Sequence, residues 1–515
     1  MVTAEQRKLI DDIWQAFYNG GMSVSSTIID QLCVLMFIKM LDDKQAKVET
    51  KALKLHIELK DDNLTFKSGD WENPETGVKV PYSFMRWSNF KHLNPNELSR
   101  RVRDYCYPFI KTLSESSDDV FSKFLGDVTY GFDGKQDVLV KVVDMMSSID
   151  FTDNDAMGDF FEHLIDGKLN GQFRTPRHII DMMVEMIKPQ LHDKIIDPAM
   201  GTAGFLIESA KYIKEHNKEE LLNKENRKFF SEHQFAGVDT EPIMTRIGCM
   251  NLSFHDVAKP NLGTSSLLIE QNNAKHIGQY DIVLANPPFK GSLDADLTDP
   301  RILAVTKTGK TELLFVALFT KLLKVGGKCA SIVPDGVLFG AGKAYQNLRR
   351  ELVENQKLIA VVSMPGGIFQ PYSGVKTSFI LFEKTNHGGT DNVWFFDMQA
   401  DGYSLDAKRE QSEDNDIPEV LARFSNLDNE LTRKRTEQSF FVPIDELRNN
   451  NYDLSIGRYK KTVRKKVIYR SSNEICGDIV SEEKMKIQYM NNFRKMLGLS
   501  EIKAKDLFGD ENEKC

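Results

Sequence analysis

The sequence predicts an α/β protein: a parallel sheet covered by helices on both faces, preceded by a helical N-terminal domain and followed by a helical C-terminal tail. Three observations support this fold class. Residues 151–400 alternate short β-rich runs with helical runs, as parallel strands joined by crossover helices do. Residues 1–150 show helical periodicity instead. Residues 461–515 are polar, with an expected helix near residues 482–497.

Length and charge narrow the class of protein. A chain of 515 residues is too long for one ordinary core, and length alone indicates about three domains. The net charge of −8 argues against a protein whose whole surface grips DNA, because such proteins use a basic excess to displace counterions. If DNA is the substrate, another subunit would therefore provide much of the DNA-binding affinity. The basic cluster at residues 458–470 is equally well explained as a solvated face.

Nothing in the sequence indicates a membrane or an export signal. The longest apolar stretches, such as residues 32–38, fall far short of the roughly 20 residues that cross a bilayer. The chain start has no apolar core like that of a signal peptide. The six cysteines are scattered without a Cys-x-x-Cys pair, so we expect reduced thiols and neither disulfides nor a zinc site. These features predict a cytoplasmic protein without a membrane partner or a metal.

The N-terminal domain, residues 1–150, is expected to contact partners or DNA. Its first helix has an apolar face made of Leu9, Ile10, Ile13, Trp14 and Phe17. Residues 28–41 form a second, strongly apolar helical segment.

Residues 151–400 are predicted to form the central sheet domain. Its candidate strands are residues 194–197, 235–239, 280–285, 328–333, 359–364 and 377–383, with a further β-rich stretch at 392–398. Helical runs such as residues 311–324 and 343–355 separate most of these strands.

Residues 401–460 are interpreted as a charged excursion that returns to the core. Between residues 404 and 440 the chain is charged and short of large apolar residues, which is typical of a surface excursion or a mobile segment. The run Tyr452-Asp-Leu-Ser-Ile-Gly-Arg-Tyr459 then leads to the tail, residues 461–515. Because a charged helix in this tail would bury little by itself, we expect it to dock on a partner.

The segment Asp197-Pro-Ala-Met-Gly-Thr-Ala-Gly204 follows the first β-rich run of the central domain and opens a helix. Small residues let the backbone turn tightly and approach a ligand, and the start of a helix offers unpaired N–H groups. The segment is typical of a nucleotide-binding loop, although similar turns also serve as plain strand-to-helix connections in doubly wound folds.

The next β-rich run, Phe235-Ala-Gly-Val-Asp239, ends in an acid. In dinucleotide-binding and related folds a carboxylate at this place accepts hydrogen bonds from ribose hydroxyls, and we assign that role to Asp239. Glu241 could take the role instead, or both acids could simply charge the start of the following helix.

Upstream of these runs, Gly171-Gln-Phe-Arg-Thr175-Pro176 precedes a helix with apolar periodicity. Thr175 as the N-cap with Pro176 at the first helical position makes a good helix start. That explanation does not cover the Gly-Gln-Phe before it, so we expect this loop to contact a ligand.

The most informative segment is Asn286-Pro-Pro-Phe289, directly after the β-rich run 280–285. It presents an amide oxygen, a stiff backbone carbonyl and a flat ring together, which is what methylation of a planar exocyclic amino group requires. Alone, it could be an asparagine turn before two prolines. Its place after a nucleotide-type loop and an acid-ended strand brings several features to one crevice at the carboxyl ends of a parallel sheet.

Taken in order, Gly-Gln-Phe-Arg-Thr-Pro, Asp-Pro-Ala-Met-Gly-Thr-Ala-Gly-Phe-Leu, Gly-Val-Asp and Asn-Pro-Pro-Phe resemble the motifs of the N6-adenine DNA methyltransferases. The chain is more closely similar to the modification subunit of type I restriction-modification systems, a likeness that extends to residues 364–377 and 451–455. The resemblance implies a Rossmann-like class I methyltransferase sheet, S-adenosylmethionine as the cofactor and N6 of adenine in DNA as the methyl acceptor.

The cofactor loop departs from the wider methyltransferase pattern at one place. Many members have Gly-Ser-Gly where this chain has Gly201-Thr202-Ala203. The sequence Gly-Thr-Ala-Gly is familiar from the type I branch, so we do not interpret it as a loss of cofactor binding.

The resemblance also assigns roles to residues. Asn286, Pro287, Pro288 and Phe289 would form the catalytic segment, in which Phe289 stacks on a flipped adenine. Asp239 would bind the cofactor's ribose, and Asp256 resembles the position that contacts the cofactor's adenine. The other residues expected around the cofactor are Gln172, Phe173, Arg174, Thr175, Pro176, Arg177, Asp197, Gly201, Thr202, Ala203 and Gly204. His255 is interpreted as structural, because no second ligand accompanies it.

The resemblance implies partners as well. Type I modification subunits act in a complex, which implies DNA, a specificity subunit, a second copy of the chain and, optionally, a restriction translocase subunit. The chain shows no long insertion suited to reading the major groove, so sequence specificity is expected from a separate subunit.

Three other interpretations remain open at this stage. Methyltransferases that act on protein glutamine also use Asn-Pro-Pro-aromatic, because the amide nitrogen poses the same chemical problem. A non-catalytic assembly subunit that retains the cofactor pocket would have a sequence similar to that of an active methyltransferase. A nicotinamide oxidoreductase is the weakest of the three, because the turn after the first strand does not match GxGxxG.

Overall fold

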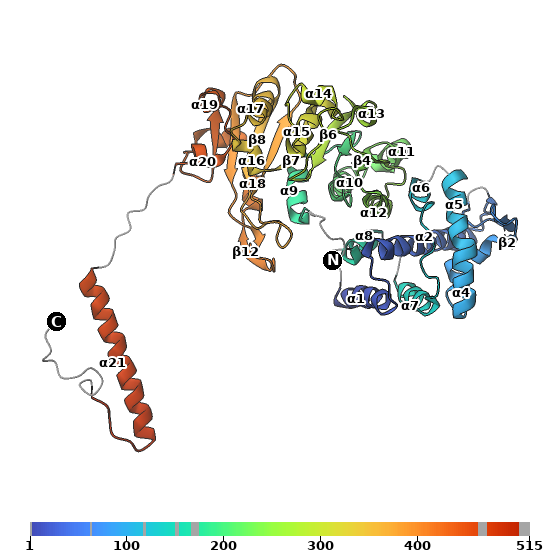
Figure 1. Cartoon of the computed structure of the whole chain (residues 1–515), viewed down its shortest axis with the longest axis horizontal. Coiled ribbons are helices and arrows are strands. Elements are labelled where there is room, and N and C mark those ends of the chain that lie inside the picture. The colour runs from blue at the N-terminus through green and yellow to red at the C-terminus, as the bar shows by residue number, and fades with distance from the viewer. Residues whose placement is uncertain are drawn as a thin grey trace. The chain divides into compact units, whose positions relative to one another are not determined.

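The computed structural model describes residues 3–61, 64–116, 120–149, 154–165, 175–461 and 471–503 (Figure 1). The chain divides into two compact units, Met1–Lys460 and Lys461–Cys515. Among the described residues, no helix combines the length and the apolar character that crossing a membrane requires.

The N-terminal region is mainly helical, as predicted. Helix α1 (Ala4–Asn19) begins with a capping box in which Thr3 and Gln6 exchange side-chain to backbone hydrogen bonds. Its buried residues are Ile10, Ile13, Trp14 and Phe17, which confirms the expected apolar face. Helix α2 (Ser25–Leu55) runs for 31 residues and is buried over most of its first half. The other helices described in this region are η2 (Tyr82–Met85), α3 (Trp87–Phe90), α4 (Pro95–Arg101), η3 (Val102–Cys106), α5 (Tyr107–Ser116), α6 (Val120–Leu125), α7 (Gln136–Ser147) and α8 (Asn154–Ile165).

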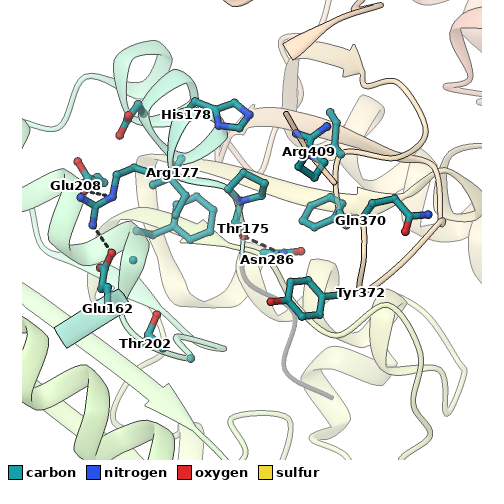
Figure 2. A pocket seen from close by; sticks show the side chains of 18 of the residues that line it. Glu162, Thr175, Arg177, His178, Thr202, Glu208, Asn286, Gln370, Tyr372 and Arg409 are labelled. Atoms are coloured by element: carbon teal, nitrogen blue, oxygen red, sulfur yellow. Dashed lines mark hydrogen bonds and ion pairs between the residues drawn. The ribbon is translucent and has the colours of Figure 1, made fainter. Parts of the chain in front are cut away.

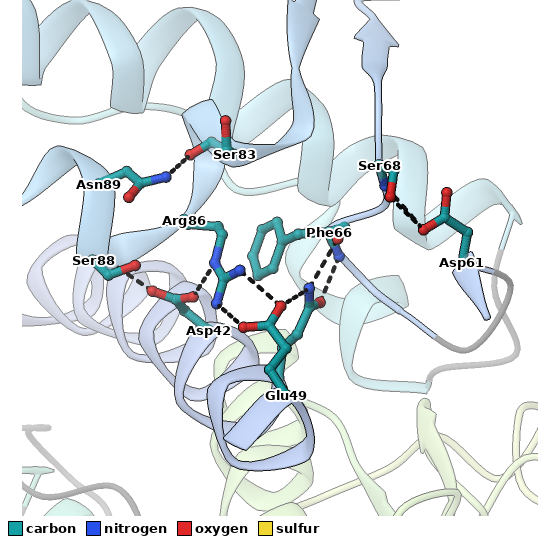
Figure 3. Close-up of polar contacts among 10 residues, drawn as sticks. Asp42, Glu49, Asp61, Phe66, Ser68, Ser83, Arg86, Ser88 and Asn89 are labelled. Carbon is teal, nitrogen blue, oxygen red and sulfur yellow. Dashed lines mark hydrogen bonds and ion pairs between the residues drawn. The ribbon is translucent and has the colours of Figure 1, made fainter. Parts of the chain in front are cut away.

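The N-terminal region also contains a short β-hairpin and an arginine that bridges two acids of α2. Strands β1 (Asp70–Glu72) and β2 (Lys79–Pro81) pair antiparallel. After them, Arg86 lies between two acids of α2 and donates to Asp42 over 2.6 Å and to both Glu49 oxygens over 2.9 and 3.0 Å (Figure 3). The Ser88 backbone N–H donates to the second Asp42 oxygen over 2.7 Å. One face of α2 therefore has its acidic groups occupied by internal contacts.

A nine-stranded sheet forms the centre of the first unit, with the strand order β13-β10-β8-β9-β7-β6-β3-β4-β5. Strands β3, β4, β5, β6 and β7 are mutually parallel, as are β8 and β10. Two strands depart from a fully parallel sheet: β9 runs antiparallel to both β7 and β8, and β13 runs antiparallel to β10 at the edge. The bounds are β3 (Ile195–Asp197), β4 (Phe235–Asp239), β5 (Asn261–Thr264), β6 (Tyr280–Ala285), β7 (Leu323–Pro334), β8 (Lys357–Ser363), β9 (Thr377–Glu383), β10 (Asn392–Asp397) and β13 (Ser439–Pro443).

Apolar side chains cover both faces of this sheet. Neighbouring residues of one strand point to opposite faces, so Ile195 joins one core cluster and Ile196 the other. Helix α15 (Thr311–Leu322) packs in the cluster of Ile196, whereas α9 (Arg177–Ile187) and α10 (Gly204–His216) pack in that of Ile195. The remaining helices around the sheet are η4 (Glu220–Leu222), α11 (Lys224–Glu232), α12 (Pro242–Phe254), α13 (Glu270–Asn273), α14 (Pro300–Leu303), α16 (Asp335–Phe339), α17 (Lys343–Arg350) and η5 (Glu351–Asn355).

Helix α12 belongs to two parts of the protein at once. Its residues Met244, Ile247, Met250 and Phe254 lie in the same buried cluster as the N-terminal helices, and α12 packs against α2, α6 and α8. The other side of α12 meets the turn after β3, where a Cβ on Gly248 would lie 3.3 Å from the Gly201 carbonyl oxygen. The N-terminal helices and the sheet thus share a continuous interface.

Residues 401–460 contain several regular elements. Strands β11 (Asp401–Tyr403) and β12 (Gln411–Asn415) form a hairpin, and β13 pairs antiparallel with β10 at the sheet edge. Between them lie α18 (Ile417–Phe424) and η6 (Leu427–Thr432), and after them α19 (Ile444–Asn449) and α20 (Ile456–Tyr459).

The second unit is dominated by helix α21 (Ser472–Met496). The helix begins about ten residues before the expected start at residue 482, because Ser471 and Glu474 form a capping box. None of its residues is buried. Its large exposed apolar side chains are Ile475, Ile479, Val480, Met485, Tyr489, Met490, Phe493 and Met496.

Candidate active site

A cavity of about 880 Å³ opens at the carboxyl ends of β3 and β6. Strand β3 lies between β4 and β6, so the chain crosses to opposite sides of the sheet here, which is where open α/β sheets bind ligands. Figure 2 shows Asn286 and Thr175 between two groups of lining residues. Glu162, Arg177, Thr202 and Glu208 lie on one side, and Gln370, Tyr372 and Arg409 on the other.

The turn after β3 is built for close backbone approach. Gly201 and Ala203 both have positive φ angles, +52° and +66°, and α10 begins directly after them at Gly204. The Gly201 N–H donates to the Asp239 carboxylate over 3.0 Å, which holds the turn against the end of β4. A Cβ at Gly237 in β4 would come within 2.3 Å of the Met200 sulfur, so glycine there lets the turn lie on the strand.

Asp197 is the most buried ionisable group of the cavity wall, with 1% of its surface exposed. Burial raises its pKa to about 8, with a small further rise from Asp239 and an opposing effect from the Ala199 N–H. That N–H donates to the Asp197 carboxyl over 3.0 Å. Near neutral pH the group is therefore largely protonated while no cation faces it.

Asp239 ends β4, as predicted, but its carboxylate is already in use. One oxygen accepts from Gly201 and the other from the Glu241 N–H over 2.9 Å. Burial raises the pKa of Asp239, and these backbone hydrogen bonds oppose the rise. Neither Asp239 nor Glu241 lines the cavity, and Glu241 is exposed at the N-cap of α12. The choice between the two acids for a ribose contact therefore stays a prediction.

The start of α9 differs by one residue from the expected helix start. Pro176 is the N-cap and the helix begins at Arg177, so Thr175 is not the capping residue. The Thr175 hydroxyl instead accepts a hydrogen bond of 2.9 Å from the Asn286 side-chain N–H₂. Arg177 forms an ion pair with Glu162 and a second one with Glu208 over 3.3 Å.

Asn286 lies directly after β6, with its side chain at the cavity. Its Nδ2 is bonded to Thr175, whereas its Oδ1 is buried and has no hydrogen-bond partner among the described residues. Pro287 is buried, Pro288 is exposed and Phe289 is half-buried. The Phe289 ring meets that of Phe369 edge-on, with centroids 5.4 Å apart and an angle of 82° between planes.

Some of the predicted site residues are not found among the residues that line the cavity. Gln172, Phe173 and Arg174 lie outside the described residues. Asp256 is exposed after the end of α12, does not line the cavity, and pairs with Lys214 over 2.8 Å. His255 is fully buried, and a Cβ at Gly158 would come within 2.4 Å of its ring, which fits a packing role.

Two further walls of the cavity differ in how far the sequence pointed to them: one lies in residues 364–377, noted only for their family likeness, and the other carried no recognisable signal. The loop after β8 contributes Ile368, Phe369, Gln370, Pro371 and Tyr372. The β11–β12 hairpin contributes Tyr403, Ala407, Lys408 and Arg409. These segments approach the cavity only in the folded chain, and the hairpin is too charged to show a strand pattern.

The hairpin wall is fixed by a buried carboxylate. Asp401 accepts a hydrogen bond from His178 over 2.9 Å and forms an ion pair with Arg409. Burial would raise the pKa of Asp401, but the hydrogen bonds from His178 and Arg409 outweigh burial and lower it. The Tyr403 ring stacks on His178, with centroids 4.7 Å apart. The hairpin is thus attached to the first turn of α9.

The sequence matches the family described as N-6 DNA Methylase over residues 152–467, more than half of the chain. The chain belongs to the N-6 DNA methylase family. Residues 7–146 match a second description, the HsdM N-terminal domain. These two matches together cover the N-terminal helices, the sheet and the cavity.

Two related proteins support this family assignment. The methylase subunit of the type I restriction enzyme EcoEI from Escherichia coli is 25% identical over 506 residues, covering 95% of this chain and 96% of that protein. The StySPI methylase subunit from Salmonella potsdam is 32% identical over 285 residues, 51% of this chain and 53% of that protein. The second match therefore spans about half of each protein.

Solved structures share the fold. A structure described as the basis of complex assembly and conformational transition of the type I R-M system matches with a TM-score of 0.65 and 24% identity, over 95% of this chain and 98% of that one. A type I methyltransferase subunit from Streptococcus thermophilus matches with a TM-score of 0.66 and 18% identity, over 89% and 100%. The predicted class I methyltransferase fold is confirmed.

Proposed function

We propose that this protein transfers a methyl group from S-adenosylmethionine to N6 of adenine in DNA, as the modification subunit of a type I restriction-modification complex. Family membership supports DNA adenine methylation, and the names of its relatives, type I methylase subunits, support the complex. The observation that carries the chemistry is the Asn286 side chain, whose Oδ1 is buried at the cavity and receives no hydrogen bond from the part of the chain that the structure describes.

An amide oxygen in that state costs free energy unless a ligand supplies a hydrogen bond. A buried polar atom without a partner is disfavoured by about 1–3 kcal/mol. The hydrogen bond from Nδ2 to Thr175 fixes which end of the amide faces the ligand, because only Oδ1 remains to accept. The N6 amino group of adenine carries two N–H donors and is a matching ligand.

The chemical difficulty is that the adenine N6 lone pair is delocalised into the ring. If Asn286 Oδ1 and the Pro287 carbonyl accept the two N6 hydrogens, the nitrogen moves toward tetrahedral geometry and its lone pair becomes available. S-adenosylmethionine supplies an electrophilic methyl group on a cationic sulfur. Asn286 and Pro287 would orient the N6 lone pair toward the methyl group of a bound donor; as the N–C bond formed, the S–C electron pair would stay on the donor's sulfur and one N6 proton would pass to water. The expected rate enhancement comes from positioning N6 and the methyl group, more than from proton abstraction by a strong base.

The charges of the cavity fit this cofactor. S-adenosylmethionine has a sulfonium and an ammonium group, and the carboxyl groups of Asp197, Glu162 and Glu208 line the cavity. The carboxylate of S-adenosylmethionine is matched by the guanidinium of Arg177, which already pairs with Glu162 and Glu208. The positive-φ turn at Gly201 brings backbone close to the ligand without side-chain bulk.

An aromatic pair at the cavity fits a planar base: Phe369 lines the cavity, and Phe289, which is not among the lining residues, packs against it. Phe289 and Phe369 meet edge-on, so Phe289 is held by a contact that leaves one ring orientation preferred. An adenine can reach this pocket only after it leaves the duplex, and stacking on an aromatic ring offsets part of that unstacking cost.

The partners follow from the same proposal. We assign sequence recognition to a separate specificity subunit, with a second copy of this chain and a restriction subunit completing the assembly. Helix α21 is our candidate for docking on a partner, because no residue on it is buried although it carries many large apolar side chains.

The test is methyl transfer from tritiated S-adenosylmethionine to DNA, with and without the specificity subunit. Asn286→Ala should lower kcat by about 10²–10³-fold, the usual loss when one hydrogen-bonding group at a transition state is removed, with cofactor affinity unchanged. A matched control is Asn450→Ala, an asparagine far along the chain whose side chain is half-buried. Transfer to protein glutamine instead of DNA, or full activity in the Asn286 variant, would refute the proposal.

A further inference from the structure

Among the described residues, four lysine or arginine side chains line the cavity: Arg7, Arg177, Lys408 and Arg409. Arg177 begins α9, and Lys408 and Arg409 lie between β11 and β12. Arg7 comes from α1, the first helix of the N-terminal region. One cation of the cavity wall therefore belongs to a part of the chain that lies outside the sheet and its covering helices.

Three of these four cations already have acidic partners. Arg177 forms ion pairs with two glutamates of the cavity wall, and Arg409 pairs with the buried aspartate of its hairpin. The Lys408 ammonium lies 3.9 Å from a glutamate oxygen of the same hairpin. Arg7 differs, because within the described ranges it forms no ion pair, not even with Asp11 at i+4 on its own helix.

The position of Arg7 at the cavity follows from the packing of α1 against α8. The Trp14 indole N–H donates to the Leu164 backbone carbonyl of α8 over 2.6 Å. Arg7 precedes Trp14 by about two helical turns, so the two side chains lie on the same face of α1, about 10 Å apart along its axis. Glu162 and His163 of α8 also line the cavity. Helices α1 and α8 thus reach the same wall together.

An exposed arginine such as Arg7 is often no more than a solvated side chain. The charges of this cavity favour another explanation. Its wall carries the acids Glu162, Asp181, Asp197 and Glu208, yet Arg7 pairs with none of them in the part of the chain that the structure describes. Acids and an unpaired guanidinium in one cavity fit a zwitterionic ligand, whose positive groups face the acids and whose carboxylate requires a cation.

We propose that the Arg7 guanidinium binds the carboxylate of the methionyl end of S-adenosylmethionine. A guanidinium presents paired N–H donors in a plane, which matches the two oxygens of a carboxylate. Arg177 lies on the same wall, but its charge is shared between Glu162 and Glu208 (Figure 2). Arg7 supplies positive charge that no described acid neutralises. Bound cofactor therefore contacts the N-terminal helical region as well as the sheet.

This inference rests on the proposed function in that S-adenosylmethionine is taken as the ligand of the cavity. It adds the group of that ligand which the N-terminal region recognises. A phosphate of DNA is the competing ligand for Arg7, and the experiment separates the two.

The experiment compares S-adenosylmethionine with decarboxylated S-adenosylmethionine, which lacks only the carboxylate and keeps the sulfonium and ammonium groups. Calorimetric titration of the full chain without DNA gives both Kd values. The wild type should bind the decarboxylated ligand more weakly. Arg7→Ala should reduce that preference by about tenfold, as expected for the loss of one charge-assisted contact. Its affinity for the decarboxylated ligand should not fall, because Arg7 has no carboxylate to bind there.

Two further variants test whether the charge and its position are responsible. Arg7→Lys keeps the positive charge but not the paired donors, so it should retain part of the preference. Lys8→Ala removes the same charge from the next residue of α1, which is exposed and does not line the cavity. Lys8→Ala should bind both ligands as the wild type does. Both replaced side chains are exposed, so the Tm of each variant should stay near that of the wild type.

Equal weakening of both ligands by Arg7→Ala would overturn the proposal, because it would show that Arg7 supports the shape of the cavity and does not contact the carboxylate. An unchanged preference in Arg7→Ala would overturn it as well. If that variant also bound a fluorescent DNA duplex more weakly than the wild type and Lys8→Ala do, Arg7 would be assigned to a phosphate of DNA.

The outcomes separate this inference from the proposed function. A chain that shows the Arg7-dependent preference but never methylates adenine retains the role of Arg7 and refutes the methyltransferase proposal. Adenine methylation with a preference that Arg7 does not affect refutes the role of Arg7 alone.

Discussion

Asn286 and Thr175 are joined by a hydrogen bond of 2.9 Å across 111 positions of the chain. The bond connects the carboxyl end of β6 to the residue before the N-cap of α9. It leaves Asn286 Oδ1 as an acceptor at the cavity to which no residue within the described ranges donates. Thr175 is therefore a positioning residue for the amide, in addition to the cofactor contact that the sequence predicts for its loop.

Replacing Thr175 by valine should test this positioning role. Valine keeps the shape but removes the hydroxyl, so the Asn286 amide is no longer held in one orientation. We expect kcat to fall about tenfold, matching the loss of one hydrogen bond of about 1–1.5 kcal/mol. Thr175→Ser keeps a hydroxyl and should restore most of the activity. A valine variant that changes only the cofactor Kd would assign Thr175 to cofactor binding instead.

Phe289 should affect binding of the target adenine and not binding of the cofactor. If Phe289 stacks on the flipped adenine, Phe289→Ala should lower kcat/KM for DNA by about 10–100-fold, since base stacking contributes about 1–3 kcal/mol. Phe289→Tyr keeps the ring and should stay near wild type. The direct readout is the fluorescence of 2-aminopurine in place of the target adenine, which rises when the base leaves the stack. Weaker cofactor binding with unchanged base flipping would contradict this assignment.

Seven of the nine strands of the central sheet could be predicted, because their signals are local, whereas β5 and β13 were not among the candidate strands. Strand β4 ends at Asp239 and β6 ends directly before Asn286, as the apolar runs and the residues that interrupt them indicated. The direction of β9 could not be predicted, because alternating or continuous apolar residues look the same in parallel and antiparallel strands.

The cavity was only half predictable for a related reason. The cofactor turn and the Asn286 segment have recognisable residue types, whereas Tyr403 and Arg409 come from a charged hairpin with no apolar periodicity. Their place on the wall depends on Asp401 binding His178, a contact between residues 223 positions apart. Such a contact leaves no mark in a local pattern.

Asp197 should make stability depend on pH. Its folded-state pKa is raised to about 8 by burial, against about 3.9 for an unfolded aspartate. Between these values the folded state keeps a proton that the unfolded state has released, so the free energy of unfolding falls as pH rises, by at most about 1.4 kcal/mol per pH unit. Asp197→Asn cannot titrate and removes this dependence.

The measurement is the difference in Tm between Asp197→Asn and wild type at several pH values from about 5 to about 8. The difference should grow in favour of the variant as pH rises. A cofactor cation facing Asp197 would favour the charged carboxylate, so binding at pH 7 should release protons to the buffer in the wild type and fewer in the variant. A Tm difference that is constant with pH would show that Asp197 is ionised in the folded protein.

Asp30 and Arg246 form the ion pair that ties α2 to α12, with two hydrogen bonds of 2.9 and 3.2 Å. Burial raises the pKa of Asp30, and the guanidinium of Arg246 lowers it only in part, so the pair does not fully repay its desolvation. Arg246→Met should therefore destabilise the protein by about 1–3 kcal/mol, because it leaves the half-buried Asp30 without its partner. The double variant Asp30→Leu, Arg246→Met should lie closer to wild type than the single one.

Urea unfolding of the four proteins closes this double-mutant cycle, and cofactor binding adds a second readout. Helix α12 also carries Asn251, whose side-chain N–H₂ donates to the Thr202 carbonyl in the cofactor turn over 3.0 Å. If the ion pair holds α12 in place, Arg246→Met should weaken cofactor binding as well as stability, and the double variant should recover both. Additive effects of the two substitutions, with no recovery, would mean that Asp30 and Arg246 act independently and that the pair does not hold the helix.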